Sequence, residues 1–139
     1  MDLRQITEDF AVSPQIAVAD VPAIAAAGFR TIMCNRPDGE ETGQPDCAAI
    51  SEAAAAAGLE FRAVPFTAAT MTEADVAAFG KALAECPKPM LAFCRTGTRS
   101  TMMWSMVSLE SLGAGEVLRR AQAAGYDMSG LVAQLQSRR

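Results

Sequence analysis

The residues best suited to chemistry in this chain lie in one stretch, MLAFCRTGTRSTMMWS, which runs from Met90 to Ser105. Cys94 ends an apolar run and opens a short polar loop that closes at Arg99, after which an apolar helical pattern begins. This order predicts a strand, an anion-sized loop and a helix N-terminus. Backbone N–H groups, the positive end of the helix dipole and Arg99 would converge on Cys94, and such surroundings favour a thiolate. The stretch therefore predicts a nucleophilic cysteine within an oxyanion cradle.

The other polar residues of this loop are candidates for binding and catalysis. The predicted substrate-binding residues are Arg95, Thr96, Gly97 and Thr98. Arg99 is expected to bind an oxyanion, with a surface ion pair as the weaker alternative, whereas Arg95 is as readily a solvent-facing side chain. Ser100 is expected both to cap the following helix and to donate to the thiolate, and Thr98 could do either. Gly97 is expected to supply a backbone conformation or a close approach that other residues cannot.

Composition excludes several kinds of chemistry. The chain has no histidine, which excludes Cys-His and Ser-His catalysis and histidine-based metal sites. Its four cysteines show no C-x-x-C spacing, so neither a zinc ribbon nor a thioredoxin-type pair is suggested. No metal or organic cofactor is expected. A net charge of −4 argues against a nucleic-acid partner, because phosphate backbones are met by surplus Lys and Arg.

The whole chain, residues 1–139, is expected to form one soluble domain. The first ten residues, MDLRQITEDF, carry charges where a signal peptide needs an apolar run, and no apolar stretch is long enough to span a membrane. These features predict a cytoplasmic protein without a membrane partner. The cytosol would keep its thiols reduced.

Strand and helix patterns alternate along the chain and must position the loop. Predicted strands cover 4–12 (an edge strand), 29–34, 61–66 and 90–93, and predicted helices cover 21–27 (with Asp20 as N-cap), 46–57, 72–85, 100–112, 116–124 and 129–136. This alternation predicts an α/β fold with a central parallel sheet of about four to five strands flanked by helices. Ligands of such sheets lie outside the carboxyl ends of the strands, so Cys94, Cys34 and the loops 36–44 and 67–70 are expected together.

Further residues near the loop have open interpretations. The segment around Asp38 is first a Pro-Asp-Gly turn, although Asp38 or Glu40 could be a replacement acid or a substrate contact. Cys34 is expected to be a core cysteine, with a protective disulfide or a persulfide relay to Cys94 as the alternative. Cys47 and Cys86 are expected to be ordinary core cysteines. The run of Met102, Met103, Trp104 and Met106 is expected to pack behind the loop, with a homo-oligomer surface as the alternative.

The loop and its surroundings resemble known thiolate enzymes. Protein tyrosine phosphatases use C-x5-R, usually with Gly three after Cys and Ser after Arg, and rhodaneses use a six-residue loop. This chain keeps Gly97 and Arg99-Ser100 but closes one residue early, at the rhodanese length. The strings FAVSPQI, CNRPDGEE, GQP and CRTGTRS resemble the phosphatase-like domain of the beta-lactamase-hydrolase-like proteins over about residues 1–126. The resemblance implies a dual-specificity-phosphatase-like fold, in a family described both as phosphatase-like and as sulfur transferases.

The chemistry of the leaving group favours sulfur transfer over phosphate ester hydrolysis. Phosphatases of the resembled fold usually supply an Asp acid from the loop before the Cys-bearing strand, but this chain has no carboxylate there until Glu73 and Asp75. It also has Phe93 where they have a histidine. Sulfur transfer needs no such acid, so the expectation is a sulfurtransferase with a Cys94 persulfide, a thiosulfate or persulfide donor and an acceptor thiol. The alternatives are a cysteine-dependent phosphatase and a non-catalytic module that binds a small oxyanion.

Overall fold

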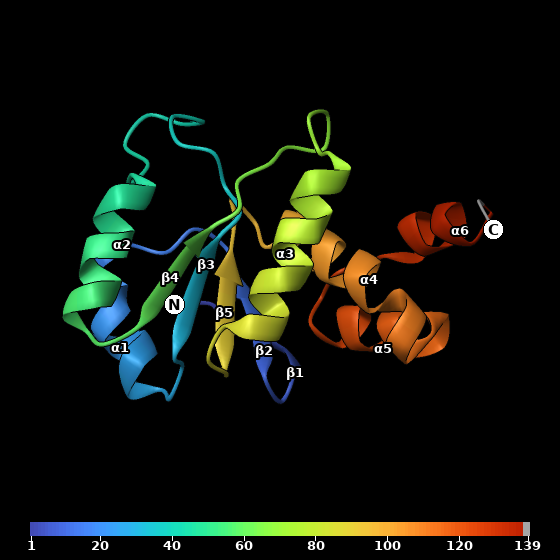
Figure 1. Cartoon of the computed structure of the whole chain (residues 1–139), viewed down its shortest axis with the longest axis horizontal. Coiled ribbons are helices and arrows are strands. Elements are labelled where there is room, and N and C mark those ends of the chain that lie inside the picture. The colour runs from blue at the N-terminus through green and yellow to red at the C-terminus, as the bar shows by residue number, and fades with distance from the viewer. Residues whose placement is uncertain (138–139) are drawn as a thin grey trace.

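The computed structural model describes residues 1–137 and contains one five-stranded sheet with helices on both faces (Figure 1). The strands are β1 (Arg4–Thr7), β2 (Phe10–Ser13), β3 (Thr31–Cys34), β4 (Glu60–Ala63) and β5 (Met90–Phe93). The helices are the 3₁₀ turn η1 (Val18–Asp20), α1 (Val21–Ala26), α2 (Cys47–Ala56), α3 (Glu73–Glu85), α4 (Thr98–Leu112), α5 (Ala114–Ala123) and α6 (Ser129–Ser137). The predicted α/β class with a helix-flanked sheet is confirmed.

The strand order β1-β2-β5-β3-β4 places the cysteine-bearing strand β5 in the centre of the sheet. Strands β2, β3 and β4 run parallel to β5 or to its neighbour, and every residue of β2, β3 and β5 is buried. Burial on both faces explains why these strands read as continuous apolar runs. Their carboxyl ends therefore meet at one edge, where the β5–α4 loop lies.

Successive side chains of the central strands enter two separate cores. Leu91 and Phe93 pack with Ile32 against α1 and α2, whereas Met90 and Ala92 pack on the opposite face with residues of α3 to α6. This alternation is the period of two expected of a strand with both faces covered. Figure 1 shows α1 and α2 on one side of the sheet and α3 to α6 on the other. Met103 and Trp104 are buried in the core on the α3 to α6 side, as expected for packing behind the loop.

The N-terminal strand prediction was wrong, because residues 4–12 form part of a hairpin rather than one edge strand. The side chain of Thr7 accepts a hydrogen bond from the Asp9 N–H at 3.2 Å, and the chain reverses over the two polar residues Glu8 and Asp9. Strand β1 then pairs antiparallel with β2 and takes the sheet edge, while β2 becomes an interior strand beside β5. The sheet is parallel except for this edge strand.

Two predicted helix starts agree with the structure, and one differs. Helix α1 begins at Val21 with Asp20 at the N-cap position, as predicted, but the Asp20 side chain accepts from the Ala17 N–H at 2.8 Å and makes no side-chain cap on α1. Helix α4 begins at Thr98 rather than Ser100, with Gly97 as N-cap. The capping box at the start of α3 is confirmed by reciprocal hydrogen bonds between Thr72 and Asp75 at 3.2 and 2.9 Å. Within residues 1–137, no helix combines the length and apolarity that crossing a membrane requires.

Candidate active site

Cys94 follows β5 directly and is buried at the edge of the sheet where the parallel strands end. Its own N–H lies 3.4 Å from the carbonyl oxygen of Ser13, which continues the pairing with β2 by one residue. The backbone N–H of Gly97 points back at the sulfur and donates to Sγ at 3.1 Å. A donor aimed at a sulfur stabilises the thiolate more than the thiol, which is the arrangement that the sequence predicted for this loop.

Gly97 is the one position of the loop that requires glycine. Its φ is +89°, in the left-handed region, and a Cβ built there would overlap the hydroxyl oxygen of Tyr126 and lie 3.0 Å from its Cζ. That hydroxyl donates to the carbonyl oxygen of Thr96 at 2.9 Å. The guanidinium of Arg4 lies over the other side of the ring, with Cζ 5.0 Å from the centroid. Tyr126 thus supports the loop from outside, a role that the sequence did not reveal.

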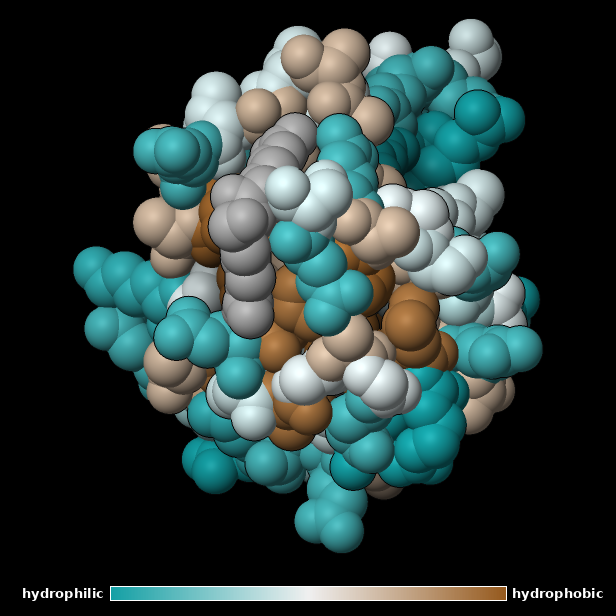
Figure 2. Space-filling model, turned by 90° about the vertical axis from the view of Figure 1, so that its right-hand side faces the viewer, coloured by the Kyte–Doolittle hydropathy of each residue, from teal (hydrophilic) through white to brown (hydrophobic). Residues whose placement is uncertain are grey.

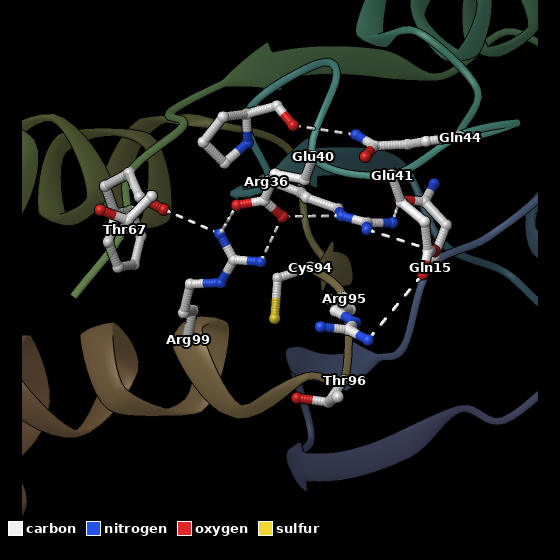
Figure 3. Close-up of polar contacts among 12 residues, drawn as sticks. Gln15, Arg36, Glu40, Glu41, Gln44, Thr67, Cys94, Arg95, Thr96 and Arg99 are labelled. Atoms are coloured by element: carbon white, nitrogen blue, oxygen red, sulfur yellow. Dashed lines mark hydrogen bonds and ion pairs between the residues drawn. The ribbon is translucent and has the colours of Figure 1, made fainter. Parts of the chain in front are cut away.

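Arg99 is held in place by a carboxylate from another loop (Figure 3). Its two terminal nitrogens donate to the two oxygens of Glu40 at 2.9 and 2.7 Å, and one of them also donates to the carbonyl oxygen of Phe66 at 3.1 Å. A bidentate pair of this kind fixes the plane of the guanidinium. The predicted meeting of the loop 36–44 with the Cys94 loop is therefore confirmed, and Phe66, directly before the loop 67–70, reaches the same place.

Two donors of Arg99 remain available for a bound oxyanion. A guanidinium has five N–H donors, and the contacts with Glu40 and Phe66 occupy three of them. The Nε–H and one terminal N–H have no hydrogen-bond partner among residues 1–137. The pKa of Arg99 is raised, first by the hydrogen bonds to Glu40 and further by the charge of Cys94, so the guanidinium stays charged beside the sulfur.

Glu40 sits between two arginines and is not suited to donating a proton. The guanidinium of Arg99, followed by that of Arg36, lowers the pKa of this carboxyl from 4.5 to about 2. Glu40 is consequently an anion at neutral pH, which contradicts its predicted role as a replacement acid. Its contacts instead make it a positioning residue for Arg99.

Arg36 is buried and holds Glu40 from the other side, a role that could not be predicted from the sequence. Its side chain is only 1 % exposed. It donates to Glu40 at 2.8 Å and to the Gln15 side-chain oxygen at 3.0 Å, with Glu41 at 3.5 Å (Figure 3). A buried guanidinium needs such partners, since unpaired burial of a charge is costly. The only available signal was its place in the string CNRPDGEE.

Ser100 does not have either of its predicted roles. Its hydroxyl donates to the Asn35 side-chain oxygen at 2.8 Å, and the Asn35 amide donates to the Val64 carbonyl at 3.0 Å. Because α4 starts two residues before Ser100, this side chain faces the sheet and is fully buried. Ser100 therefore ties the first turn of α4 to β3 and β4, and neither caps the helix nor donates to Cys94.

The rim of the loop is exposed. Arg95 has a side chain that is 66 % exposed and approaches Glu41 only at 3.8 Å, which fits the solvent-facing alternative. The hydroxyls of Thr96 and Thr98 bond to each other at 2.9 Å, and both residues are exposed. Thr98 accordingly makes no contact with the sulfur. These three residues form the exposed face of the loop that holds the buried Cys94.

Asp38 has a structural role at the N-terminus of α2. Its carboxylate accepts from the Cys47 N–H at 2.8 Å, in the first turn of α2, where the helix dipole favours a negative charge. The prediction of Asp38 as an acid or substrate contact therefore finds no support in the geometry. No cluster of three or more His, Cys, Asp or Glu within residues 1–137 could hold a metal ion.

Cys34 is a buried core cysteine at the end of β3, as expected. Its sulfur lies 2.8 Å from the sulfur of Cys47, a contact that the sequence did not predict. The prediction of Cys47 as an ordinary core cysteine was wrong, because it is half-buried and in contact with Cys34. Cys86 is buried at the end of α3, as predicted.

Comparison with known proteins agrees with this architecture. The chain aligns over 100 % of its length with a candidate phosphatase of Neisseria meningitidis, at 38 % identity, 99 % coverage of that chain and a TM-score of 0.86. TpbA of P. aeruginosa shares the fold at 18 % identity and a TM-score of 0.61, covering 98 % of this chain and 91 % of its own. Fold and site together define a cysteine-dependent enzyme of the protein tyrosine phosphatase-like class.

The family is defined by closer relatives. Residues 2–110 match the phosphatase-like domain of the Beta-lactamase hydrolase-like proteins. The chain is 40 % identical over 104 residues to the Beta-lactamase hydrolase-like protein of Agrobacterium fabrum, covering 75 % of this chain and 24 % of that protein. This protein belongs to that phosphatase-like domain family, which confirms the resemblance seen in its sequence strings. The chain spans less than a third of the length of the curated relatives that it matches.

Proposed function

We propose that this domain is a sulfurtransferase in which Cys94 carries the transferred sulfur as a persulfide. The observation that supports the proposal is that, among residues 1–137, the two carboxylates expected as acids beside the cysteine loop are both engaged in other contacts. Glu40 is an anion between two arginines, and Asp38 caps α2. Glu73 and Asp75, the first carboxylates after the loop 67–70, lie in the first turn of α3, where Asp75 is engaged in the capping box. Reactions whose leaving group departs as a stable anion suit such a site.

The proposed first step uses thiosulfate as donor. The Cys94 thiolate attacks the outer sulfur, a new S–S bond forms on Cys94, and the S–S bond of thiosulfate breaks. Sulfite leaves with the electron pair and needs no proton. The Gly97 N–H and the two free donors of Arg99 are placed to hold the negative charge around the sulfur.

The second step returns the enzyme to its starting state. An acceptor thiolate attacks the outer sulfur of the Cys94 persulfide, the persulfide S–S bond breaks, and Cys94 leaves as a thiolate. The acceptor departs as a persulfide, or as thiocyanate when cyanide replaces the thiol. Arg95, Thr96 and Thr98 form the exposed face of the loop, whereas Cys94 itself is fully buried, so the acceptor must displace part of this face to reach the sulfur.

The test is a paired assay on the purified domain with wild type, Cys94→Ser and Cys86→Ser. Thiosulfate with a thiol or cyanide acceptor is expected to give sulfite in wild type and Cys86→Ser, and none in Cys94→Ser. Mass spectrometry after thiosulfate alone should find one added sulfur on the peptide that holds Cys94. Cys94-dependent phosphate release with no sulfite and no added sulfur would overturn the proposal.

A phosphatase acting on activated esters is the second candidate, supported by the 38 % identity to the candidate phosphatase of Neisseria meningitidis. The missing acid sets a clear expectation for it. Aryl and acyl phosphates, whose leaving groups are stable anions, would be hydrolysed far faster than alkyl phosphates. No turnover of either thiosulfate or aryl phosphate would instead favour a module that only binds an oxyanion.

A further inference from the structure

We propose that Cys34 and Cys47 form a reversible disulfide that is separate from the nucleophile and closes the loop carrying Arg36 and Glu40. The two sulfurs lie 2.8 Å apart, well inside van der Waals contact. A small further approach would bring them to the length of a disulfide bond. Neither thiol contributes to the chemistry of Cys94 described above. The proposal holds equally whether Cys94 transfers sulfur or hydrolyses phosphate.

Both sulfurs of the pair lie close to the same backbone carbonyl oxygen. The Cys34 sulfur lies 3.3 Å and the Cys47 sulfur 3.8 Å from the carbonyl oxygen of Arg36. Cys34 is fixed by its strand, and Cys47 is fixed in the first turn of α2 by the Asp38 carboxylate on its N–H. Approach of the sulfurs therefore needs only a small shift of a helix end toward a strand end.

The two thiols differ in access, which gives them different parts in the oxidation. Cys47 is half-buried and reachable by a small oxidant, whereas Cys34 is 2 % exposed and shielded. With a hydroperoxide, the Cys47 sulfur attacks the O–O bond, an S–O bond forms, and the displaced oxygen leaves as water or alcohol. The Cys34 sulfur then attacks the Cys47 sulfur, the S–S bond forms, the S–O bond breaks, and a second water leaves. Two thiols are oxidised and one peroxide is reduced.

The pair is expected to react slowly at neutral pH. Burial raises the pKa of the Cys34 thiol, and burial together with the neighbouring Cys34 sulfur raises the pKa of the Cys47 thiol. Both are mostly protonated near neutral pH, and only the thiolate attacks peroxide. The oxidation rate should therefore rise about tenfold per pH unit between about pH 7 and 9.

The disulfide would act on the active site through the loop between the two cysteines. This segment holds Arg36 and Glu40, which fix the guanidinium of Arg99. Closing a ring of this length restricts the unfolded chain, so the oxidised form should melt at a temperature higher by roughly 10 °C. Reduction with dithiothreitol should reverse the shift.

The chain allows a direct test by tryptic digestion without reduction. Trypsin cleaves after Arg30 and Arg62 but not at the Arg36–Pro37 bond, so both thiols of the pair lie in the single peptide 31–62. Wild type and Cys94→Ser are treated with hydrogen peroxide, and remaining thiols are blocked with iodoacetamide. The expected result in both is peptide 31–62 with two hydrogens lost and no alkylation. Cys47→Ser should lose this product and the shift in melting temperature, and Cys86→Ser should keep both.

Two results would overturn the proposal. Peptide 31–62 joined to peptide 82–95 in wild type and Cys86→Ser, without the internal product in Cys94→Ser, would mean that a cysteine of the pair bonds to the nucleophile instead. Full alkylation of peptide 31–62 after unfolding, in protein that peroxide has oxidised at Cys94, would mean that the pair does not oxidise. The second readout uses wild-type protein alone and does not depend on how a variant folds.

Discussion

Replacing Glu40 by Gln removes the one carboxylate that holds both Arg99 and Arg36. The variant keeps the size of the side chain but loses the charge that accepts hydrogen bonds from three guanidinium nitrogens. Arg99 would then be free to leave the plane that presents its two remaining donors to Cys94. Arg36, which is almost fully buried, would keep only Gln15 and the more distant Glu41.

The magnitude follows from the pKa of this carboxyl. A shift from 4.5 to about 2 corresponds to roughly 3 kcal/mol of preferential interaction with the ionised form. A quarter of the Glu40 side chain is exposed, and solvent screens part of its interaction with the arginines. This interaction is therefore expected to contribute about 1–2 kcal/mol to the free energy of unfolding. Because the folded-state pKa is lowered, this stabilisation is present above pH 4.5 and is lost as the pH falls toward about 2.

The assay is urea unfolding of wild type and Glu40→Gln at pH 7 and at pH 3, with Cys94-dependent turnover measured at pH 7. Glu40→Gln should cost about 1–2 kcal/mol at pH 7 and less at pH 3, and should reduce turnover by roughly 10- to 100-fold. The matched control is Glu41→Gln, whose carboxylate is 55 % exposed and touches its arginines only at 3.5 and 3.8 Å. That variant should change stability by less than about 0.5 kcal/mol. Equal effects of the two variants, or no pH dependence, would refute the reasoning.

Three further variants test the support of the loop and of α2. Gly97→Ala should destabilise the protein by about 2 kcal/mol or more, since it forces a left-handed φ and overlaps the Tyr126 hydroxyl, and adding Tyr126→Phe should recover part of the loss in thermal unfolding. Ser100→Ala should cost about 1–2 kcal/mol, because the buried Asn35 oxygen loses its donor, while the alkylation rate of Cys94 stays within about twofold. Asp38→Asn should lower the free energy of unfolding in urea by about 0.5–1 kcal/mol and leave turnover unchanged. A large loss of turnover would show that Asp38 takes part in the reaction.

Features that depend on neighbouring residues could be predicted from the sequence. The bounds of β5 agree with the predicted 90–93, because a buried parallel strand reads as an apolar run ended by polar residues. The capping box of Thr72 and Asp75 has a fixed spacing that the chain shows directly. The cysteine loop and its closing arginine also form a local pattern, so their placement at the sheet edge needed only the rule for parallel sheets.

Partners distant in sequence could not be predicted, and they decide what the remaining residues do. Ser100 has its hydrogen-bond partner 65 residues away, and Arg99 has its carboxylate 59 residues away. The Tyr126 hydroxyl reaches Thr96 from a helical tail whose pattern shows only amphipathic packing. The N-terminal hairpin was missed for a related reason, because a two-residue polar turn without Gly or Pro gives a weak turn signal.

The charges of the site explain why binding alone does not separate its two candidate reactions. Three arginines and two glutamates meet around the sulfur, namely Arg36, Arg95, Arg99, Glu40 and Glu41. Glu40 and Glu41 offset two of these arginines, so before the charge of Cys94 is counted the surplus is a single positive charge, assisted by the start of α4. Thiosulfate and a phosphate monoester are both dianions, and this surplus attracts them alike. Discrimination must therefore arise after binding, at the leaving group, where the lack of a proton donor slows the loss of an alkoxide but not of sulfite.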